Sequence, residues 1–172
     1  TGAIGLALLN AFPEAHCVGC DISSEAVKLS LENAAKVGVE NRYKCLESSI
    51  ESLSSSDVGK FHLIVSNPPY IPPKDMEGLD SDVKDYEDWR ALCGVSDDGL
   101  EVINQIIEKT PGLLLPCSEG GFGSLWLEVD SSHPTLLQSK FRDERSFAWY
   151  EDMGGLPRFI KIEFLIKKQT AK

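Results

Sequence analysis

The sequence lacks the long apolar stretches of a membrane protein. No run of about eighteen apolar residues occurs, so we predict no membrane-spanning helix. Hydrophobic residues still make up 42% of the 172 residues, which is enough for a sizeable core. A chain of this length fits one domain, and we predict a single domain over residues 1–172.

Positive charge is also scarce. The chain has 17 Lys and Arg residues against 27 Asp and Glu residues, which gives a formal net charge of -10. An acidic surface repels phosphate backbones, whereas most nucleic-acid binders carry a basic patch. The charge therefore argues against a DNA or RNA substrate.

The cysteines and histidines do not have the spacing of a disulfide framework or a metal site. The 5 cysteines are scattered, as is typical of free thiols in a reducing compartment. Cys17 and Cys20 form a C-x-x-C, but residues three apart on a strand point to opposite faces. We therefore expect two buried strand cysteines and no bound metal. His16, His62 and His133 are expected in polar-strand or capping positions.

What the sequence does contain is an alternation of helical and strand patterns. This alternation is typical of an α/β fold, with a mostly parallel sheet and helices on both faces. Two other segments, 48–57 and 74–98, are expected to be irregular, and the second is long enough to be functional or disordered. Helices are expected at 4–12, 23–38, 100–115 and 134–140, and strands at 16–20, 43–46, 61–66, 122–129, 146–150 and 159–166.

Asp21 is the first candidate binding residue, because ligands of open α/β sheets bind beyond the carboxyl ends of the strands. It ends a predicted strand and follows Gly2, which opens a helix, by about twenty residues. In that geometry a carboxylate binds the two ribose hydroxyls of a nucleoside. An ordinary helix cap explains Asp21 equally well, since only the tail of a glycine-rich loop, Thr1-Gly2, is present.

The segment Asn67-Pro68-Pro69-Tyr70 is the most specific motif. An amide or exocyclic amino nitrogen is a poor nucleophile because its lone pair is delocalised. Two acceptors that hold both of its N–H bonds, the Asn67 side-chain oxygen and the Pro68 carbonyl, can turn that lone pair toward a methyl sulfonium. The prolines stiffen the loop and Tyr70 can stack on the flat substrate group.

A simple turn that ends a strand is the other interpretation of this segment, because Asn and Pro are common turn residues. Its position favours a function, since it directly follows the apolar strand predicted at 61–66 and lies downstream of Asp21. We therefore predict that Asn67 to Tyr70 are catalytic.

Together these segments resemble the HemK/PrmC family of release-factor glutamine methyltransferases. The resemblance rests on Thr1 to Ile4, Asp21, the strand at 63–66 and residues 67–71. Three further segments are most similar to the eukaryotic, mitochondrial branch: 86–92, 127–134 and 157–159. The Asn-Pro-Pro-Tyr motif alone is shared with adenine-amino methyltransferases, so the combination is the more specific signal.

The resemblance implies a Rossmann-like class I methyltransferase that uses S-adenosylmethionine. It implies, as substrate, the glutamine of a Gly-Gly-Gln motif in a class I peptide chain release factor. By position, Thr1 and Gly2 match the end of the cofactor loop, Asp21 the ribose-binding acid, and Asn67 to Tyr70 the clamp on the substrate amide. Asn67 also borders the cofactor in this assignment. A mitochondrial location follows from the resemblance alone, and otherwise a cytoplasmic one is expected.

The chain departs from the family in several places. Ser48 or Ser49 stands where relatives often have an acidic residue near the adenine, with Glu47 just before, and Trp89 stands where they usually have proline. The first strand, most of the glycine loop and the N-terminal helical substrate-docking domain of the family are absent from the sequence. We therefore expect a sheet without its first strand, which would lie between the strands at 16–20 and 61–66, and an inactive fragment.

Two other functions compete with protein-glutamine methylation. A nucleic-acid adenine N6-methyltransferase would use the same clamp, but the net charge of -10 disfavours it. A decayed domain could bind a partner without catalysis, but the intact Asn67 to Tyr70 segment argues against that.

Overall fold

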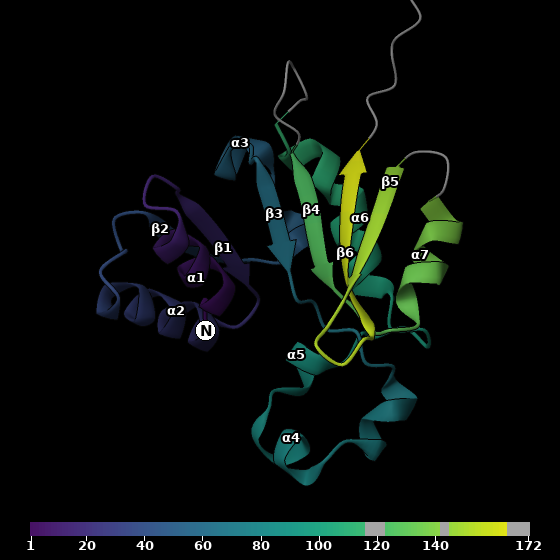
Figure 1. The fold of residues 1–172 in the computed structure, drawn as a ribbon. Coiled ribbons are helices and arrows are strands. Elements are labelled where there is room, and N and C mark those ends of the chain that lie inside the picture. Colours follow the sequence, from purple (N-terminus) through teal and green to yellow (C-terminus); the bar gives the residue numbers. More distant parts are fainter. Residues whose placement is uncertain (116–122, 142–144, 165–172) are drawn as a thin grey trace, which may run out of the picture. The chain divides into compact units, whose positions relative to one another are not determined.

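The computed structural model describes residues 1–115, 123–141 and 145–164 (Figure 1). Its contacts divide the chain into two compact units, Thr1–Gly59 and Lys60–Lys172, which are described separately below. The single domain expected over 1–172 stays a prediction. None of the helices in the described ranges is long and apolar enough to cross a membrane.

The first unit is a small α/β arrangement with a two-stranded parallel sheet (Figure 1). The two strands pair from Cys17 opposite Tyr43 to Asp21 opposite Glu47. Its elements are α1 (Ala3–Ala11), β1 (Cys17–Asp21), α2 (Ser24–Lys36), β2 (Tyr43–Glu47), η1 (Ile50–Ser52) and α3 (Ser55–Val58).

The ends of α2 are set by local sequence, as predicted. The Ser23 hydroxyl accepts a hydrogen bond from the Ala26 N–H at 3.3 Å and caps the first turn. At the other end, Gly38 has φ 73 and its N–H bonds to the Ala35 carbonyl, while the Val39 N–H bonds to the Ala34 carbonyl. These two bonds form a Schellman motif, which turns Val39 into the core formed by Leu9, Ala34, Val39 and Tyr43.

The buried face of α2 differs from the one predicted. We expected Val27, Leu31, Ala34 and Ala35 to be buried, but Leu31 and Ala35 are exposed and Ser30 is buried at 2% exposure. Positions 30 and 34 lie one turn apart on the same face, whereas position 31 is rotated by about 100°. The face is thus set by spacing from Ala34, with the Ser30 hydroxyl donating to the Val27 carbonyl at 2.7 Å.

The second unit is built on a four-stranded mixed sheet in the order β3-β4-β6-β5 (Figure 1). β3 and β4 are parallel, and β6 is antiparallel to both β4 and β5. The strands are β3 (Leu63–Ser66), β4 (Ser124–Glu128), β5 (Arg145–Glu151) and β6 (Pro157–Phe164), and the helices are η2 (Pro73–Gly78), α4 (Ser81–Tyr86), α5 (Trp89–Leu92), α6 (Glu101–Leu113) and α7 (His133–Phe141).

The core of the second unit joins α6 to the two middle strands. Ile103 and Ile107 of α6 are 0% exposed, as the predicted apolar face of that helix requires. The strand residues that are at most 1% exposed include Leu125 and Leu127 of β4 and Ile160 and Ile162 of β6. This core fixes the end of β4, beside which the candidate site of this unit lies.

Two segments expected to be irregular contain short helices. The 48–57 segment holds η1 and the start of α3, which begins after the Ser54 cap. The 74–98 segment holds most of η2, together with α4 and α5. A single turn of helix has too few residues to show a periodic apolar pattern, so these elements left no signal in the sequence. The parts of the predicted strands at residue 122 and at 165–166 lie outside the described residues.

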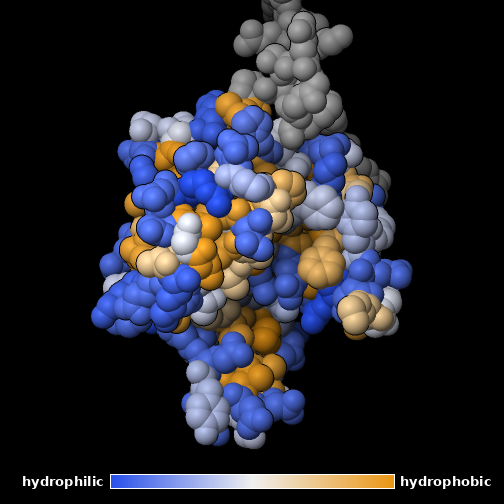
Figure 2. All heavy atoms as spheres, turned by 60° about the vertical axis from the view of Figure 1, so that its left-hand side comes forward, coloured by the Kyte–Doolittle hydropathy of each residue, from blue (hydrophilic) through white to orange (hydrophobic). Residues whose placement is uncertain are grey.

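β1 and β3 each have one hydrogen-bonded neighbour among the described strands, β2 and β4 respectively. On β3, Leu63 and Val65 are 40% and 37% exposed, although the apolar run was expected to be buried. Phe61, placed in that strand by the sequence, instead forms an isolated bridge with Leu114. Figure 2 shows that hydrophobic side chains reach the surface within an otherwise largely hydrophilic face.

Candidate functional site

In the first unit, the candidate cofactor residue Gly2 is held against a buried tyrosine. Gly2 precedes α1 with the left-handed φ of 76, and a Cβ there would lie 2.9 Å from the Tyr43 hydroxyl and 3.0 Å from the Ser30 Cβ. A Cβ at Gly19 of β1 would lie 2.9 Å from the same hydroxyl. A Cβ at either position would therefore force the Tyr43 side chain to shift. Burial, the main cause, raises the pKa of Tyr43 to about 12, so its hydroxyl is neutral.

Thr1, the other predicted member of the cofactor loop, is exposed. Its carbonyl accepts a hydrogen bond from the Asn33 side-chain amide of α2 at 3.1 Å. The residues that precede α1 are thus attached to α2 through Asn33 and packed on it through Ser30.

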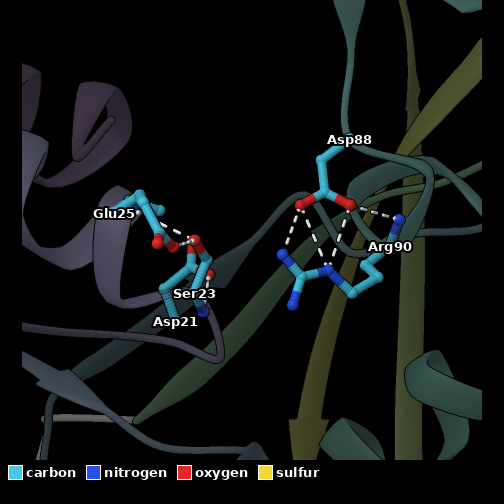
Figure 3. A network of polar contacts seen from close by, with 6 residues as sticks. Asp21, Ser23, Glu25, Asp88 and Arg90 are labelled. Atoms are coloured by element: carbon cyan, nitrogen blue, oxygen red, sulfur yellow. Dashed lines mark hydrogen bonds and ion pairs between the residues drawn. The ribbon is translucent and has the colours of Figure 1, made fainter.

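Asp21 is the last residue of β1 and is half-buried. One carboxylate oxygen accepts a hydrogen bond from the Ser23 N–H at 2.9 Å, and the Ser23 hydroxyl donates to Glu25 at 2.9 Å (Figure 3). The helix cap is therefore Ser23, and Asp21 forms the turn before it. The second carboxylate oxygen of Asp21 makes no hydrogen bond within the described ranges, which leaves an acceptor at the carboxyl end of the strand.

Polar residues at the end of β2 lie beside Asp21. Glu47 is opposite Asp21 in the strand register, and the Ser48 N–H donates to the Asp21 carbonyl at 2.9 Å. Ser48 and Ser49 are half-buried, and Glu47 is exposed. The carboxyl ends of β1 and β2 thus form one polar edge, as the parallel sheet predicts.

The paired cysteines of the C-x-x-C are less buried than expected. Cys17 is half-buried and Cys20 is exposed, so the prediction of two buried cysteines was wrong for Cys20. A two-stranded sheet covered on one face leaves alternate strand positions open to solvent. Burial, followed by the neighbouring Cys45, raises the pKa of the Cys17 thiol. Across the described ranges, no group of three or more His, Cys, Asp or Glu side chains could hold a metal.

In the second unit, Asn67 to Tyr70 leave the sheet directly after β3. Ser66 is opposite Leu127 in the register, so this segment starts beside the end of β4. Asn67 is exposed, Pro68 is buried, and Pro69 and Tyr70 are half-buried. The segment therefore anchors one proline in the unit and presents the Asn67 side chain to solvent.

The segment is closed by backbone pairing at Ile71. The Ile71 N–H donates to the Leu92 carbonyl and the Gly94 N–H donates to the Ile71 carbonyl, both at 2.9 Å. The excursion between Pro72 and Leu92 thus begins and ends at one place. Near its end, Asp88 accepts hydrogen bonds from the Arg90 backbone and side chain, and these bonds hold the pKa of Asp88 below its usual range (Figure 3).

The ring of Tyr70 lies among charged and aromatic groups. The His133 ring meets it edge to face, with centroids 6.2 Å apart and planes at 89°, and the Arg158 guanidinium carbon is 5.9 Å from its centroid. Burial raises the pKa of the Tyr70 hydroxyl; Arg158 opposes this and Glu128 reinforces it. Arg158 is in turn 3.6 Å from the Asp130 carboxylate.

Comparisons with known proteins identify relatives of this chain. Residues 1–79 match the model of the Methyltransferase small domain. Over 94% of its length the chain is 34% identical to the MTRF1L release factor glutamine methyltransferase of Homo sapiens, of which it covers 48%. It is 38% identical to the release factor glutamine methyltransferase of Fusobacterium nucleatum, with 99% of this chain and 46% of that protein aligned.

This chain is similar to release factor glutamine methyltransferases. It spans about half the length of the curated relatives it matches. The structure is also similar to the solved delta-N METTL16 MTase domain, with a TM-score of 0.62 at 10% identity, over 96% of this chain and 70% of that one. The predicted class I, Rossmann-like α/β methyltransferase fold is confirmed. At 10% identity, the similarity to this solved structure is evidence for the fold only.

The candidate site contains two residues that sequence reasoning did not assign to it. His133 was expected in a polar-strand or capping position, but it is buried at 2% exposure against Tyr70. Arg158 had entered only as part of the resemblance. His133 comes after β4 and Arg158 lies at the start of β6, and their contacts with Tyr70 join distant parts of the chain, which no local pattern reveals.

Proposed function

We propose that the whole protein transfers a methyl group from S-adenosylmethionine to the side-chain amide nitrogen of the glutamine in the Gly-Gly-Gln motif of a class I peptide chain release factor. The observation that supports this most is the Asn67-Pro68-Pro69-Tyr70 segment, which leaves β3 with a buried proline and an exposed asparagine in a chain similar to release factor glutamine methyltransferases. Release factor is named in the relatives of Homo sapiens and Fusobacterium nucleatum, and we extend it to this chain as part of the proposal.

The first unit has features that fit S-adenosylmethionine. Gly2 leaves bare backbone at the N-terminus of α1, where backbone N–H groups and the helix dipole favour a carboxylate such as that of the methionine moiety. Asp21 keeps one carboxylate oxygen as an acceptor for ribose hydroxyls. In this proposal Thr1, Gly2 and Asp21 hold the cofactor. The cofactor supplies an electrophilic methyl group on a sulfonium.

The protein's own part in the reaction is orientation. The Asn67 side-chain oxygen and the Pro68 carbonyl oxygen each accept a hydrogen bond from one of the two N–H groups of the glutamine amide. The nitrogen lone pair is then turned out of the amide plane toward the methyl carbon, and Tyr70 packs on the flat amide. As the new N–C bond forms, the methyl–sulfur bond of the sulfonium would break and a neutral thioether would leave. The nitrogen gains positive character, so its proton becomes acidic and would be lost to solvent. No base is needed before that step, and the rate enhancement comes from positioning the amide nitrogen against the methyl group.

The net charge of -10 fits a protein substrate better than a nucleic acid. The location of the protein in mitochondria, expected from the resemblance, stays a prediction.

The test is methyl transfer by the full-length protein from radiolabelled S-adenosylmethionine. We expect label in a release factor that carries Gly-Gly-Gln and none when that glutamine is replaced by alanine. A DNA or RNA oligonucleotide rich in adenine serves as the competing substrate. Label in the oligonucleotide but not in the release factor would replace this proposal with adenine N6-methylation.

A further inference from the structure

We propose that His133 is a positioning residue for methyl transfer, which acts by holding the ring of Tyr70 in place. This inference rests on the proposed function of the Asn67 to Tyr70 segment. His133 begins α7, beyond the end of β4, whereas Tyr70 lies beyond the end of β3. The two strands are parallel neighbours, so both residues lie past the carboxyl ends of the same pair.

The contact between the two rings is specific. They meet edge to face at 89° with centroids 6.2 Å apart, a geometry that aromatic pairs favour. His133 is 2% exposed, whereas Tyr70 is half-buried. The buried ring therefore supports the more open one, which in the proposed mechanism packs against the substrate amide.

A hydrogen bond fixes the orientation of His133. Its Nε2 lies 3.1 Å from the Asp98 carbonyl oxygen, 35 positions away in the sequence, and since a carbonyl only accepts, Nε2 carries the proton. Burial lowers the pKa of His133 against the opposing effect of Asp130, so the ring is neutral and keeps this tautomer. Its Nδ1 is buried and has no hydrogen-bond partner in the part of the chain that the structure describes. The single N–H group of the neutral imidazole thus donates its hydrogen bond to the Asp98 carbonyl.

The turn that accepts this bond is itself rigid. The Asp98 carboxylate accepts hydrogen bonds from the Ser96 hydroxyl at 2.6 Å and the Leu100 N–H at 3.0 Å. The Ser96 hydroxyl also accepts one from the Glu101 N–H at 3.1 Å. The turn is therefore joined to the first residues of α6, which is anchored in the core of this unit.

The same turn also contacts the backbone of Tyr70. Gly99 has φ 71, and a Cβ there would collide with the Tyr70 carbonyl oxygen. Tyr70 is thus held at two points by one structure: its carbonyl lies against Gly99, and its ring lies against His133, which is bonded to Asp98. Loss of His133 would free the ring but leave the backbone contact, so the amide acceptors at Asn67 and Pro68 would stay where they are.

The test is a double-mutant cycle in the full-length protein, with release factor as substrate. We expect His133→Leu to lower kcat about tenfold, because misplacement of a group in the reacting complex is costly. The KM for S-adenosylmethionine should change by less than about twofold, since His133 is not proposed to touch the cofactor. In a Tyr70→Leu background, the same change at His133 should lower kcat by less than about twofold.

Equal losses of kcat in the two backgrounds would show that His133 acts independently of Tyr70 and would overturn the proposal. Unchanged kcat in His133→Leu would do the same. His62→Leu is the matched control, because His62 is exposed at the opposite end of β3. If His133→Leu lowers the unfolding midpoint strongly, the cycle is run with His133→Gln, which keeps an N–H for the Asp98 carbonyl but removes the ring.

These outcomes are distinct from failure of the proposed function. If the wild-type protein labels no release factor, the function is wrong and the cycle has no substrate. The pairing of His133 with Tyr70 is then tested by the rate at which the Tyr70 ring flips, measured by NMR on tyrosine-labelled protein. A faster flip in His133→Gln than in the wild type would still show that His133 holds the ring, and an unchanged rate would overturn that as well.

Discussion

The candidate sites of the two units are built in different ways. In the first unit, Gly2 and Asp21 present backbone and one carboxylate, and both are positioned by contacts with residues of α2 and its cap. In the second unit, Tyr70 is held by Gly99 and His133, which come from separate parts of the chain. The geometry of a site formed by backbone groups and helix caps is determined by local sequence. The geometry of a site whose side chains are held by distant residues depends on the pairing of the whole sheet.

Matched glycine substitutions should show this difference most strongly. Gly2 and Gly99 both have positive φ, so alanine at either costs about 1–2 kcal/mol of strain. A Cβ at Gly99 also meets backbone, and overpacking adds about 1–3 kcal/mol. We expect Gly99→Ala to cost about 2–5 kcal/mol of stability and Gly2→Ala less, because it meets side-chain atoms that can shift.

The controls are Gly38→Ala in the first unit and Gly155→Ala in the second. Both glycines have positive φ, and a Cβ added at either would have nothing within 4 Å, so each isolates the cost of φ alone. Urea unfolding measures the effect of each variant. If Gly99→Ala lowers the free energy of unfolding no more than Gly155→Ala does, the turn at Gly99 can move away from the added Cβ without a loss of stability.

Asn67→Ala should have the next largest effect. It removes an acceptor for the substrate amide and should raise the activation free energy by about 3 kcal/mol, on the order of a hundredfold in kcat. The affinity for S-adenosylmethionine should change much less. Steady-state kinetics of the full-length protein measure both, and a kcat within twofold of wild type would remove Asn67 from the mechanism.

Asp21→Ala should produce the complementary pattern in the first unit. Loss of a hydrogen bond to a charged group should weaken S-adenosylmethionine binding by about 1.5–3 kcal/mol. Titration calorimetry of the full-length protein measures the affinity. An unchanged dissociation constant would leave Asp21 with only the turn to Ser23, and the first unit would then need another ribose ligand.

Ser23→Ala is the smallest change and the control for Asp21. It removes the cap of α2, at a cost of about 1 kcal/mol, but leaves the Ser23 N–H that donates to Asp21. Thermal unfolding should therefore shift while cofactor affinity stays nearly constant. If affinity fell as far as in Asp21→Ala, the cap and not the carboxylate would explain both results.

The sequence predicted those elements whose limits are local. Pro13 stops the first helix near Ala11, Ser23 caps the second, and Gly38 ends it. Both strands of the first unit were placed within one residue of their ends in the structure. These features depend on backbone conformation and on hydrogen bonds a few positions apart.

Other features depend on the three-dimensional arrangement. Leu31 is more apolar than Ser30, yet Ser30 is the buried one, because burial follows the direction of the side chain. The support of Tyr70 by His133 depends on parallel pairing of β3 with β4, which are separated by α6 and the preceding excursion. Composition at either position gives no sign of the partner. The candidate residues themselves could be predicted from the sequence, but the residues that hold them in place could not.

The backbone pairing at Ile71 makes the excursion of 72–92 a self-contained cassette. Its two ends meet at the backbone hydrogen bonds of Ile71 with Leu92 and Gly94. The position of the sheet therefore depends on these bonds and not on the number of residues between them. The entropy of closing a loop grows slowly, by about 0.6 kcal/mol for each doubling of length. The length of this excursion can therefore change at a small entropic cost while the backbone bonds at Ile71 and the Asn67 to Tyr70 segment stay in place.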